Sequence, residues 1–191
     1  MTPLIPYRMT VQLTLDRLTI RDWRDDDAAV IAPLANNRAV WINLRDRFPH
    51  PYTLADAEAF VARSRAEDPR RNFAICLDDR PIGSIGIVQG TDISRMSAEV
   101  GYWLGEPYWG RGYATEAIRG FADWVFANHD IIRLFATVFT YNAASGRALE
   151  KAGFIREATS RCASIKDGRI YDEWLYALIA EGTTSHVRPG G

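Results

Sequence analysis

Residues 106–126, EPYWGRGYATEAIRGFADWVF, hold the pattern around which the rest of the chain is organised. Gly110, Gly112 and Ala114 are small residues that stand immediately before and at the start of an apolar segment. The apolar side chains recur at helical spacing, at Ala114, Ala117, Ile118, Phe121, Ala122 and Val125. This spacing predicts an amphipathic helix that ends near Asn128. A glycine-rich turn before a helix can bind phosphate, because the first N–H groups of a helix lack intrahelical partners and glycine lets a ligand approach the backbone.

Two named phosphate-binding motifs do not fit this stretch. A nucleotide P-loop ends in Gly-Lys-Ser/Thr, which is absent here, and a dinucleotide fingerprint requires a third glycine where this chain has Thr115. Short glycine motifs also arise by chance, so the stretch alone leaves open a tight strand-to-helix connection without a ligand.

The segments on either side predict a mixed α/β fold. Before the stretch, the pattern predicts a strand at 13–23, helices at 24–37 and 53–68, and strands at 72–77, 82–88 and 97–104. After the helix, it predicts a strand at 131–139, a helix at 142–154 and a hairpin that joins 154–165 to 169–180. This order predicts a mixed sheet with helices on it, in a single domain over 13–180, with flexible ends at 1–12 and 181–191.

Local signals support two of these segments. Thr53, with Asp56 three residues later, predicts a capped helix start. The buried stripe predicted for that helix consists of Leu54, Ala57, Phe60 and Val61. Asp167-Gly168 is a favourable pair for the tight turn of the final hairpin.

Composition excludes several classes of protein. The 191 residues carry 23 Lys and Arg against 24 Asp and Glu, a balance that argues against a nucleic-acid surface. Cys76 and Cys162 lie far apart and the three histidines are isolated, so we expect neither a metal site nor a disulfide framework. The N-terminus has no signal pattern and no apolar run reaches membrane length, so we expect a cytoplasmic protein with no membrane partner.

Three elements in order carry a family resemblance. They are the strand AEVGYWL at 98–104, the loop at 109–114, and a later helix with Asn142, Ser145 and the run 151–154. With these elements the chain resembles the GCN5-related N-acetyltransferases (GNAT) over roughly residues 13–180, and most closely their RimJ/RimL-like branch. Trp109 departs from the Gln or Arg that usually opens the family's coenzyme-A loop, but YWGRGYATEA is typical of this branch.

The resemblance implies a fold and a co-substrate. The GNAT fold is a mixed α/β structure with a central, mostly antiparallel sheet of about seven strands flanked by about four helices. The co-substrate is acetyl-CoA, and no metal is required. Homodimers are frequent among relatives, so the resemblance also allows a homodimer.

The resemblance assigns roles to particular residues. Backbone groups of Tyr102, Trp103 and Leu104 would pair with the pantetheine arm as if it were an extra strand. Backbone N–H groups from Gly110 to Ala114 would hold the pyrophosphate, and Arg111 would either add charge there or be a solvated loop residue. The predicted cofactor-binding residues are Tyr102, Trp103, Leu104, Trp109, Gly110, Arg111, Gly112, Tyr113, Ala114, Asn142 and Ser145. Asn142 is also a candidate helix N-cap, a role compatible with a position at the thioester end.

Acetyl transfer to an amine requires removal of the amine proton, stabilisation of the carbonyl oxygen as it gains charge, and departure of the CoA thiolate, preferably protonated. Glu99 is the predicted base, acting through water, and its alternative interpretation is an exposed charge on a strand. Many relatives place a Tyr seven residues after the Asn of the later helix, where this chain has Leu149, which cannot donate a proton. Ser145 is therefore the predicted acid, with Tyr141 as a weaker candidate and solvent as a third source.

These observations predict an acetyl-CoA-dependent N-acetyltransferase in which a primary amine attacks directly within a ternary complex. The predicted acceptor is a protein or peptide N-terminus. The alternatives are a small amine, such as an antibiotic, polyamine or amino acid, and a non-catalytic acyl-CoA-binding module. Trp41, Arg45 and Arg47 lie between the first two predicted helices, where relatives build the acceptor pocket. Arg45 and Arg47 could contact an acidic acceptor there, but a charged loop is the favoured interpretation, and Trp41 is favoured as a core residue.

Overall fold

The computed structural model describes residues 11–184. Its strands are β1 (Gln12–Thr14), β2 (Thr19–Arg21), β3 (Asn72–Leu77), β4 (Arg80–Gln89), β5 (Ser97–Leu104), β6 (Arg133–Phe139), β7 (Ile155–Lys166) and β8 (Arg169–Ile179). Its α-helices are α1 (Asp27–Ala35), α2 (Arg38–Trp41), α3 (Leu54–Ala66), α4 (Tyr113–Asn128) and α5 (Ala143–Lys151). Short 3₁₀ turns at Asp92–Ser94 and Glu106–Tyr108 flank β5.

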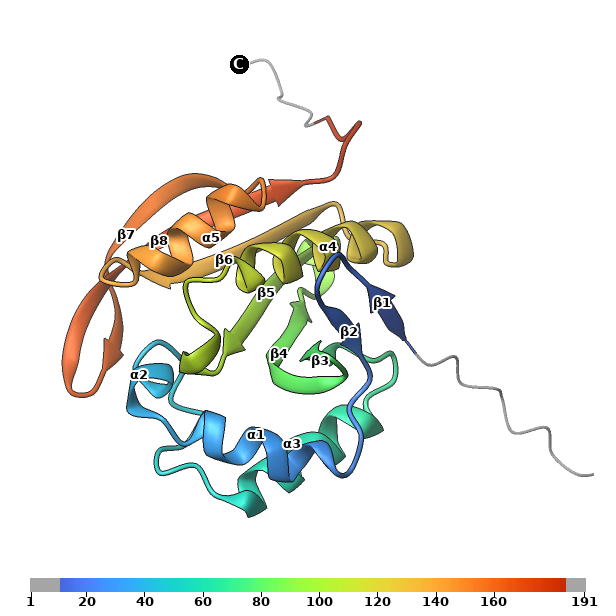
Figure 1. Cartoon of the computed structure of the whole chain (residues 1–191). Helices are drawn as coiled ribbons and strands as arrows, with labels where there is room; N and C mark the ends of the chain where they lie inside the picture. Colours follow the sequence, from blue (N-terminus) through green and yellow to red (C-terminus); the bar gives the residue numbers. More distant parts are fainter. Residues whose placement is uncertain (1–10, 185–191) are drawn as a thin grey trace, which may run out of the picture.

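The strands form one sheet in the order β1-β2-β3-β4-β5-β6-β8-β7. Only β5 and β6 pair in parallel, and every other neighbouring pair is antiparallel. Helices α4 and α5 cover one face of the sheet, and α1 to α3 lie on the other (Figure 1). The prediction of a mixed, mostly antiparallel sheet flanked by helices is confirmed.

The element count differs from the prediction at the N-terminal end. The strand predicted at 13–23 is two strands, because a turn closed by the bond from the Leu15 N–H to the Leu18 carbonyl (2.8 Å) reverses the chain. Helix α2, which was not predicted, is only four residues long. Eight strands and five α-helices result within the described residues. Gln12 lies in β1, so the flexible N-terminal segment predicted at 1–12 does not extend to this residue.

Strand β5 is covered on both faces, so its side chains contribute to two separate hydrophobic clusters on opposite sides of the sheet. Ala98, Val100 and Leu104 join α4 and α5 in the larger hydrophobic cluster. Trp103, on the opposite face, packs against the smaller cluster formed largely by α1 and α3. This alternation is the one expected for a central strand.

The cap and turn signals are confirmed, and one packing prediction is wrong. Thr53 and Asp56 form a reciprocal capping box at the start of α3. Leu54, predicted to be buried, is 48% exposed because the first turn of α3 lies at the edge of the small cluster, whereas Ala57 and Val61 are buried. Asp167 and Gly168 adopt φ values of 51° and 71° in the β7–β8 turn, as a tight hairpin turn requires.

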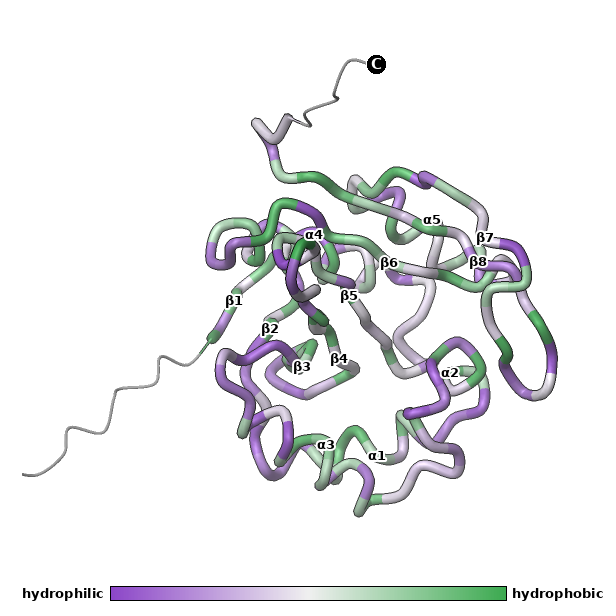
Figure 2. The backbone as a smooth tube through the Cα atoms, turned by 180° about the vertical axis from the view of Figure 1, so that it is seen from behind, coloured by the Kyte–Doolittle hydropathy of each residue, from purple (hydrophilic) through white to green (hydrophobic). Residues whose placement is uncertain are grey.

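The β7–β8 hairpin has hydrophobic and hydrophilic residues in alternation near its tip (Figure 2). Ile165 and Ile170, which pair across the two strands, are both exposed. No helix within residues 11–184 is long and apolar enough to cross a membrane. Of the flexible ends predicted at 1–12 and 181–191, residues 1–10 and 185–191 lie outside the described residues.

Candidate active site

The site begins where β5 and β6 separate. Their parallel pairing covers only Ser97–Glu99 with Arg133–Phe135, although β5 continues to Leu104 in register with β4. Beyond Glu99 the two strands diverge (Figure 1), so β5 has an open edge inside the sheet. An open strand edge offers unpaired backbone groups to an extended ligand.

Hydrogen bonds to β4 decide which residues of β5 present their backbone at this edge. The Gly105 N–H donates to the Ile82 carbonyl (2.9 Å), which fixes odd-numbered residues of β5 as those bonded to β4. The backbone groups of Trp103 therefore face β4, and the prediction that they pair with a ligand is wrong. Those of Tyr102 face the open edge. The Leu104 carbonyl faces it too, but it already accepts a hydrogen bond from the Trp109 indole (2.8 Å).

The glycine stretch forms a turn with free donors and free space. Gly110 and Gly112 have φ values of 73° and 81°, a left-handed conformation that favours glycine. Gly112 is the N-cap of α4, and no side chain caps this helix within the described part of the chain. The first helical bond runs from the Glu116 N–H to the Gly112 carbonyl, which leaves the N–H groups of residues 113–115 without intrahelical partners. A Cβ on Gly110 would meet no atom within 4 Å, so the turn has room for a ligand.

Arg17, in the β1–β2 turn, holds this loop from outside. Its Nε and Nη2 pair with the Glu116 carboxylate (2.8 Å each), and its Nη1 donates to the Arg111 carbonyl (2.9 Å). Its guanidinium also lies 4.8 Å from the centre of the Tyr113 ring. Sequence reasoning missed Arg17, because no local pattern indicates a contact between residues 99 positions apart.

Two hydroxyls meet between β5 and α5. The side-chain oxygen of Asn142 accepts the Ser145 N–H (3.2 Å), so Asn142 is an N-cap of α5. The Tyr102 hydroxyl lies 2.7 Å from Ser145 Oγ. Leu149 is fully buried in the large cluster. The alternation of β5 indicated the face of Tyr102, but sequence reasoning considered only the backbone of this residue.

Glu99 lies on the opposite face of β5 from this pair. Its side chain is 19% exposed and forms an ion pair with Arg45, from the segment between α2 and α3. Glu99 is thus neither the freely exposed charge nor the unpartnered base of the two sequence interpretations. With Oε1 engaged by Arg45, a proton from an amine can be accepted at Oε2, or at Oε1 after Arg45 moves.

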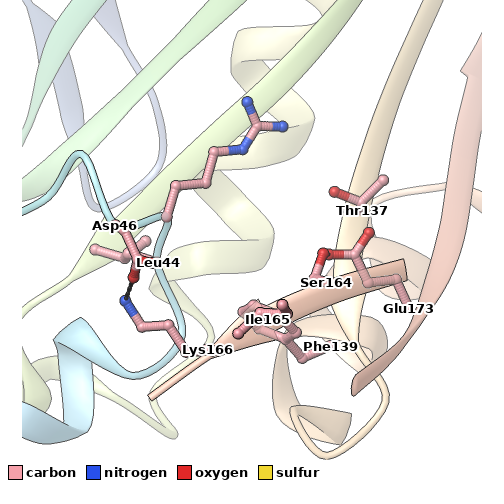
Figure 3. Close-up of a pocket in the computed structure, with 9 residues that line it drawn as sticks. Leu44, Asp46, Thr137, Phe139, Ser164, Ile165, Lys166 and Glu173 are labelled. Atoms are coloured by element: carbon pink, nitrogen blue, oxygen red, sulfur yellow. Dashed lines mark hydrogen bonds and ion pairs between the residues drawn. The ribbon is translucent and has the colours of Figure 1, made fainter. Parts of the chain in front are cut away.

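A cavity of about 390 Å³ opens beside Arg45. Its lining residues come from the α2–α3 segment, β6 and the β7–β8 hairpin (Figure 3): Leu44, Arg45, Asp46, Thr137, Phe139, Ser164, Ile165, Lys166 and Glu173. Arg47, the other arginine proposed to contact an acceptor, is exposed and is not among the residues that line it.

The charged groups of the cavity differ in their pairing. Lys166 is buried, and its Nζ bonds Asp46 Oδ1 (2.8 Å) and lies 3.8 Å from the centre of the Trp41 ring. Figure 3 shows this lysine directed at Asp46. Glu173 accepts a hydrogen bond from Ser164 but has no cationic partner among the residues the structure describes. Its carboxylate is therefore available to a cation that enters the cavity.

The sheet, the divergent strands and the loop before α4 define an acetyltransferase. Residues 17–155 match the family model of the acetyltransferase (GNAT) domain. The chain therefore belongs to the GNAT family, in its RimJ/RimL-like branch, and is an acyltransferase enzyme. The alternative of a non-catalytic binding module is not retained.

Particular relatives cover nearly the whole chain. The chain is 28% identical to an uncharacterized N-acetyltransferase p20 of Bacillus licheniformis, over 87% of this chain and 95% of that protein. It is also 28% identical to the [ribosomal protein uS5]-alanine N-acetyltransferase of Escherichia coli, over 94% of each. A solved structure of Mycobacterium smegmatis RimJ in complex with CoA-disulfide matches with a TM-score of 0.78 and 26% identity, over 90% of this chain and 87% of that one.

Proposed function

We propose that this enzyme transfers the acetyl group of acetyl-CoA to the α-amine of a protein or peptide N-terminus, by direct attack in a ternary complex. The observation that carries the proposal is the division of the site between two faces of the sheet. Ser145 lies on the α4–α5 side of the β5 opening, whereas Glu99 and the cavity with Glu173 lie on the other side. A thioester and an amine can thus reach the same opening from opposite faces.

The residues of the loop fit the pyrophosphate of acetyl-CoA. The unpaired N–H groups at the start of α4, the positive end of that helix and the open space at Gly110 suit an anion that approaches the backbone. The backbone of Tyr102 at the open strand edge suits an amide-containing arm. When bound, acetyl-CoA supplies an activated acyl group with a thiol leaving group.

The chain's own residues divide the remaining tasks. Glu173 attracts the cationic acceptor into the cavity, and Glu99 takes the amine proton directly or through water. The positive end of α5 and the Ser145 hydroxyl favour negative charge on the departing sulfur. As the acceptor enters, Arg45 either breaks its ion pair with Glu99 or keeps it while the amine binds the same carboxylate, because both cations compete for Glu99.

A protein acceptor is supported by the relatives. The E. coli relative is named as an alanine N-acetyltransferase of ribosomal protein uS5, so its named acceptor is a protein. A small amine is the competing acceptor, because a cavity of about 390 Å³ also has the size of a small-molecule site.

Thiol release from acetyl-CoA distinguishes these acceptors. The assay compares peptides with a free N-terminus, the same peptides with a blocked N-terminus and an internal lysine, and a set of polyamines, amino acids and aminoglycosides. We expect turnover with free N-termini and loss of turnover on blocking. Turnover with small amines alone would overturn the protein acceptor.

A further inference from the structure

The Tyr102–Ser145 pair connects the open edge of β5 to the first turn of α5. The Tyr102 hydroxyl lies 2.7 Å from Ser145 Oγ and 3.4 Å from the Ser145 carbonyl oxygen. Both hydrogen-bond partners of this phenol among the described residues thus belong to one residue. Either hydroxyl can donate in the shorter bond, and the direction decides where the serine hydrogen points.

The chemistry of the two groups favours Tyr102 as the donor. Burial raises the pKa of the Tyr102 phenol to about 12, so the phenol keeps its proton at neutral pH. A phenol is more acidic than an aliphatic alcohol and is therefore the better donor of the two. Of the two oxygens of Ser145 within its reach, the hydroxyl is nearer (2.7 Å) than the carbonyl (3.4 Å), so the hydroxyl is the favoured acceptor. When Ser145 Oγ accepts this bond, its own hydrogen is directed elsewhere.

The hydrogen of the Ser145 hydroxyl can be donated to a group that lies in the opening between β5 and β6. The backbone of Tyr102 faces the opening, and Ser145 lies in the first turn of α5, whose N-terminal end favours negative charge. Leu149, one turn further along α5, is buried and has no proton to give. Ser145 is the hydroxyl of α5 that the structure places beside the open edge of β5.

We propose that Tyr102 is a positioning residue that orients the Ser145 hydroxyl toward the sulfur of CoA. The inference rests on the proposed function. In the transfer, the C–N bond forms as the C–S bond breaks, the bonding pair goes to sulfur, and the Ser145 hydrogen bond stabilises the resulting thiolate. The amine proton leaves by way of Glu99 to water, and the thiolate takes a proton from water. The tyrosine on β5 thereby compensates for the tyrosine missing at Leu149.

The test compares Tyr102→Phe, Ser145→Ala and the double variant. Tyr176→Phe is the matched control, because Tyr176 is also a core tyrosine of the sheet that bonds a residue of α5, Glu150 (3.1 Å). Calorimetry measures the affinity of each protein for CoA and for desulfo-CoA, which lacks the sulfur, at pH 7 and at a pH where the thiolate forms. Turnover with acetyl-CoA and an accepted amine is the second readout, and thermal unfolding checks that each variant is folded.

We expect wild type to prefer CoA over desulfo-CoA, more so at high pH. Tyr102→Phe and Ser145→Ala should reduce this preference about equally, and the double variant should lose no more than Ser145→Ala. Their affinity for desulfo-CoA should be unchanged. Both single variants should lower kcat roughly tenfold with little change in the KM for acetyl-CoA, as expected for one hydrogen bond to a developing charge. Tyr176→Phe should behave as wild type in both assays.

An unchanged preference for CoA in Tyr102→Phe would overturn the inference, as would an equal loss of affinity for both ligands, which indicates a merely structural role. If wild type acetylates no amine but the preference depends on Tyr102, the proposed acceptor fails and the positioning role stands. If wild type is active and Tyr102→Phe equals it in both readouts, the positioning role alone fails.

Discussion

Gly112 is constrained in two ways, by its left-handed backbone conformation and by the space that a ligand at the loop would need. Its φ of 81° excludes most side chains, and a Cβ there would lie 3.4 Å from Arg17 Nη2, at the point where N–H groups are free. Gly112→Val should therefore weaken the binding of acetyl-CoA at least tenfold, roughly the loss of 1.4 kcal/mol.

The matched control for this variant is Gly182→Val. Gly182 has a φ of 77° and open space around it, so the backbone strain is similar but the position is remote in sequence from the loop. Calorimetry should show weakened binding for the first variant only. Equal affinities in two folded variants would contradict the assignment of the loop.

Glu99 is the second residue whose role can be isolated. Glu99→Gln keeps a similar shape but accepts no proton, so kcat should fall by about 10²-fold or more, the usual contribution of a positioned base. An α-amine has a pKa near 7.7–8.0 and a lysine amine near 10.4, so the loss should be smaller for an N-terminal acceptor.

Glu157→Gln is the control for Glu99→Gln, because Glu157 is also paired with an arginine, Arg133 (2.6 Å). Turnover is measured for both variants with the best peptide and with a lysine-containing analogue. Raising the pH should restore part of the activity of Glu99→Gln by deprotonating the acceptor itself. Full activity of this variant would show that Glu99 is a structural partner of Arg45.

At the scale of elements, the β1–β2 turn supports the cofactor loop. Exposed ion pairs contribute up to about 1 kcal/mol, and Arg17 adds one hydrogen bond to the loop carbonyl of Arg111. Arg17→Ala should raise the KM for acetyl-CoA about three- to tenfold and leave kcat nearly unchanged, because the loop is proposed to bind the cofactor and not to contact the reacting atoms.

Arg24→Ala is the comparison variant for Arg17→Ala. Arg24 is similarly exposed and pairs with Asp79 (2.6 Å), in a different part of the molecule. Steady-state kinetics should show the wild-type KM for this variant. A fall in kcat with an unaltered KM in Arg17→Ala would show that the arginine acts on the chemical step instead.

Elements with local signals could be predicted from the sequence, and contacts between elements could not. The capping box at Thr53, the amphipathic pattern of α4 and the Asp167-Gly168 turn each depend on residues a few positions apart. The side chain of Tyr102 meets Ser145 across 43 positions, and no periodicity encodes that contact. Trp103 shows a second limit of prediction from sequence. Which residues of a strand direct their backbone N–H and C=O groups toward a given neighbour depends on how the two strands are paired, and the sequence of one strand does not specify this pairing.

At the scale of the whole molecule, the sheet separates the proposed cofactor side from the cavity proposed for the acceptor, and the opening at β5 is the proposed route between them. Helices α4 and α5 lie on the proposed cofactor side of the sheet (Figure 1). Residues of the α2–α3 segment, β6 and the hairpin line the cavity. Arg38 of α2 pairs with Asp167 (2.6 Å), and Asp46 of the α2–α3 segment pairs with Lys166 (2.8 Å), so two ion pairs connect this part of the chain to the hairpin tip. The cavity thus depends on contacts between parts of the chain more than 100 positions apart.

The stability of the whole fold should depend on pH through His129, which follows α4. Its Nε2 is buried without a hydrogen-bond partner among residues 11–184, and its ring meets Trp124 edge-on (5.0 Å). Burial lowers the pKa of His129 from its usual 6.5, and the nearby positive charge of Arg71 lowers it further. The negative charge of Asp130 opposes this shift but does not cancel it. The unfolded chain therefore binds a proton at this residue at a higher pH than the folded chain does, so stability is full above about pH 6.5 and falls as the pH drops below it. Thermal unfolding between pH 8 and pH 5 should show a falling Tm for wild type and a flatter profile for His129→Gln, which has no proton to gain. The same slope in both proteins would assign the pH dependence to other groups and contradict the role of His129.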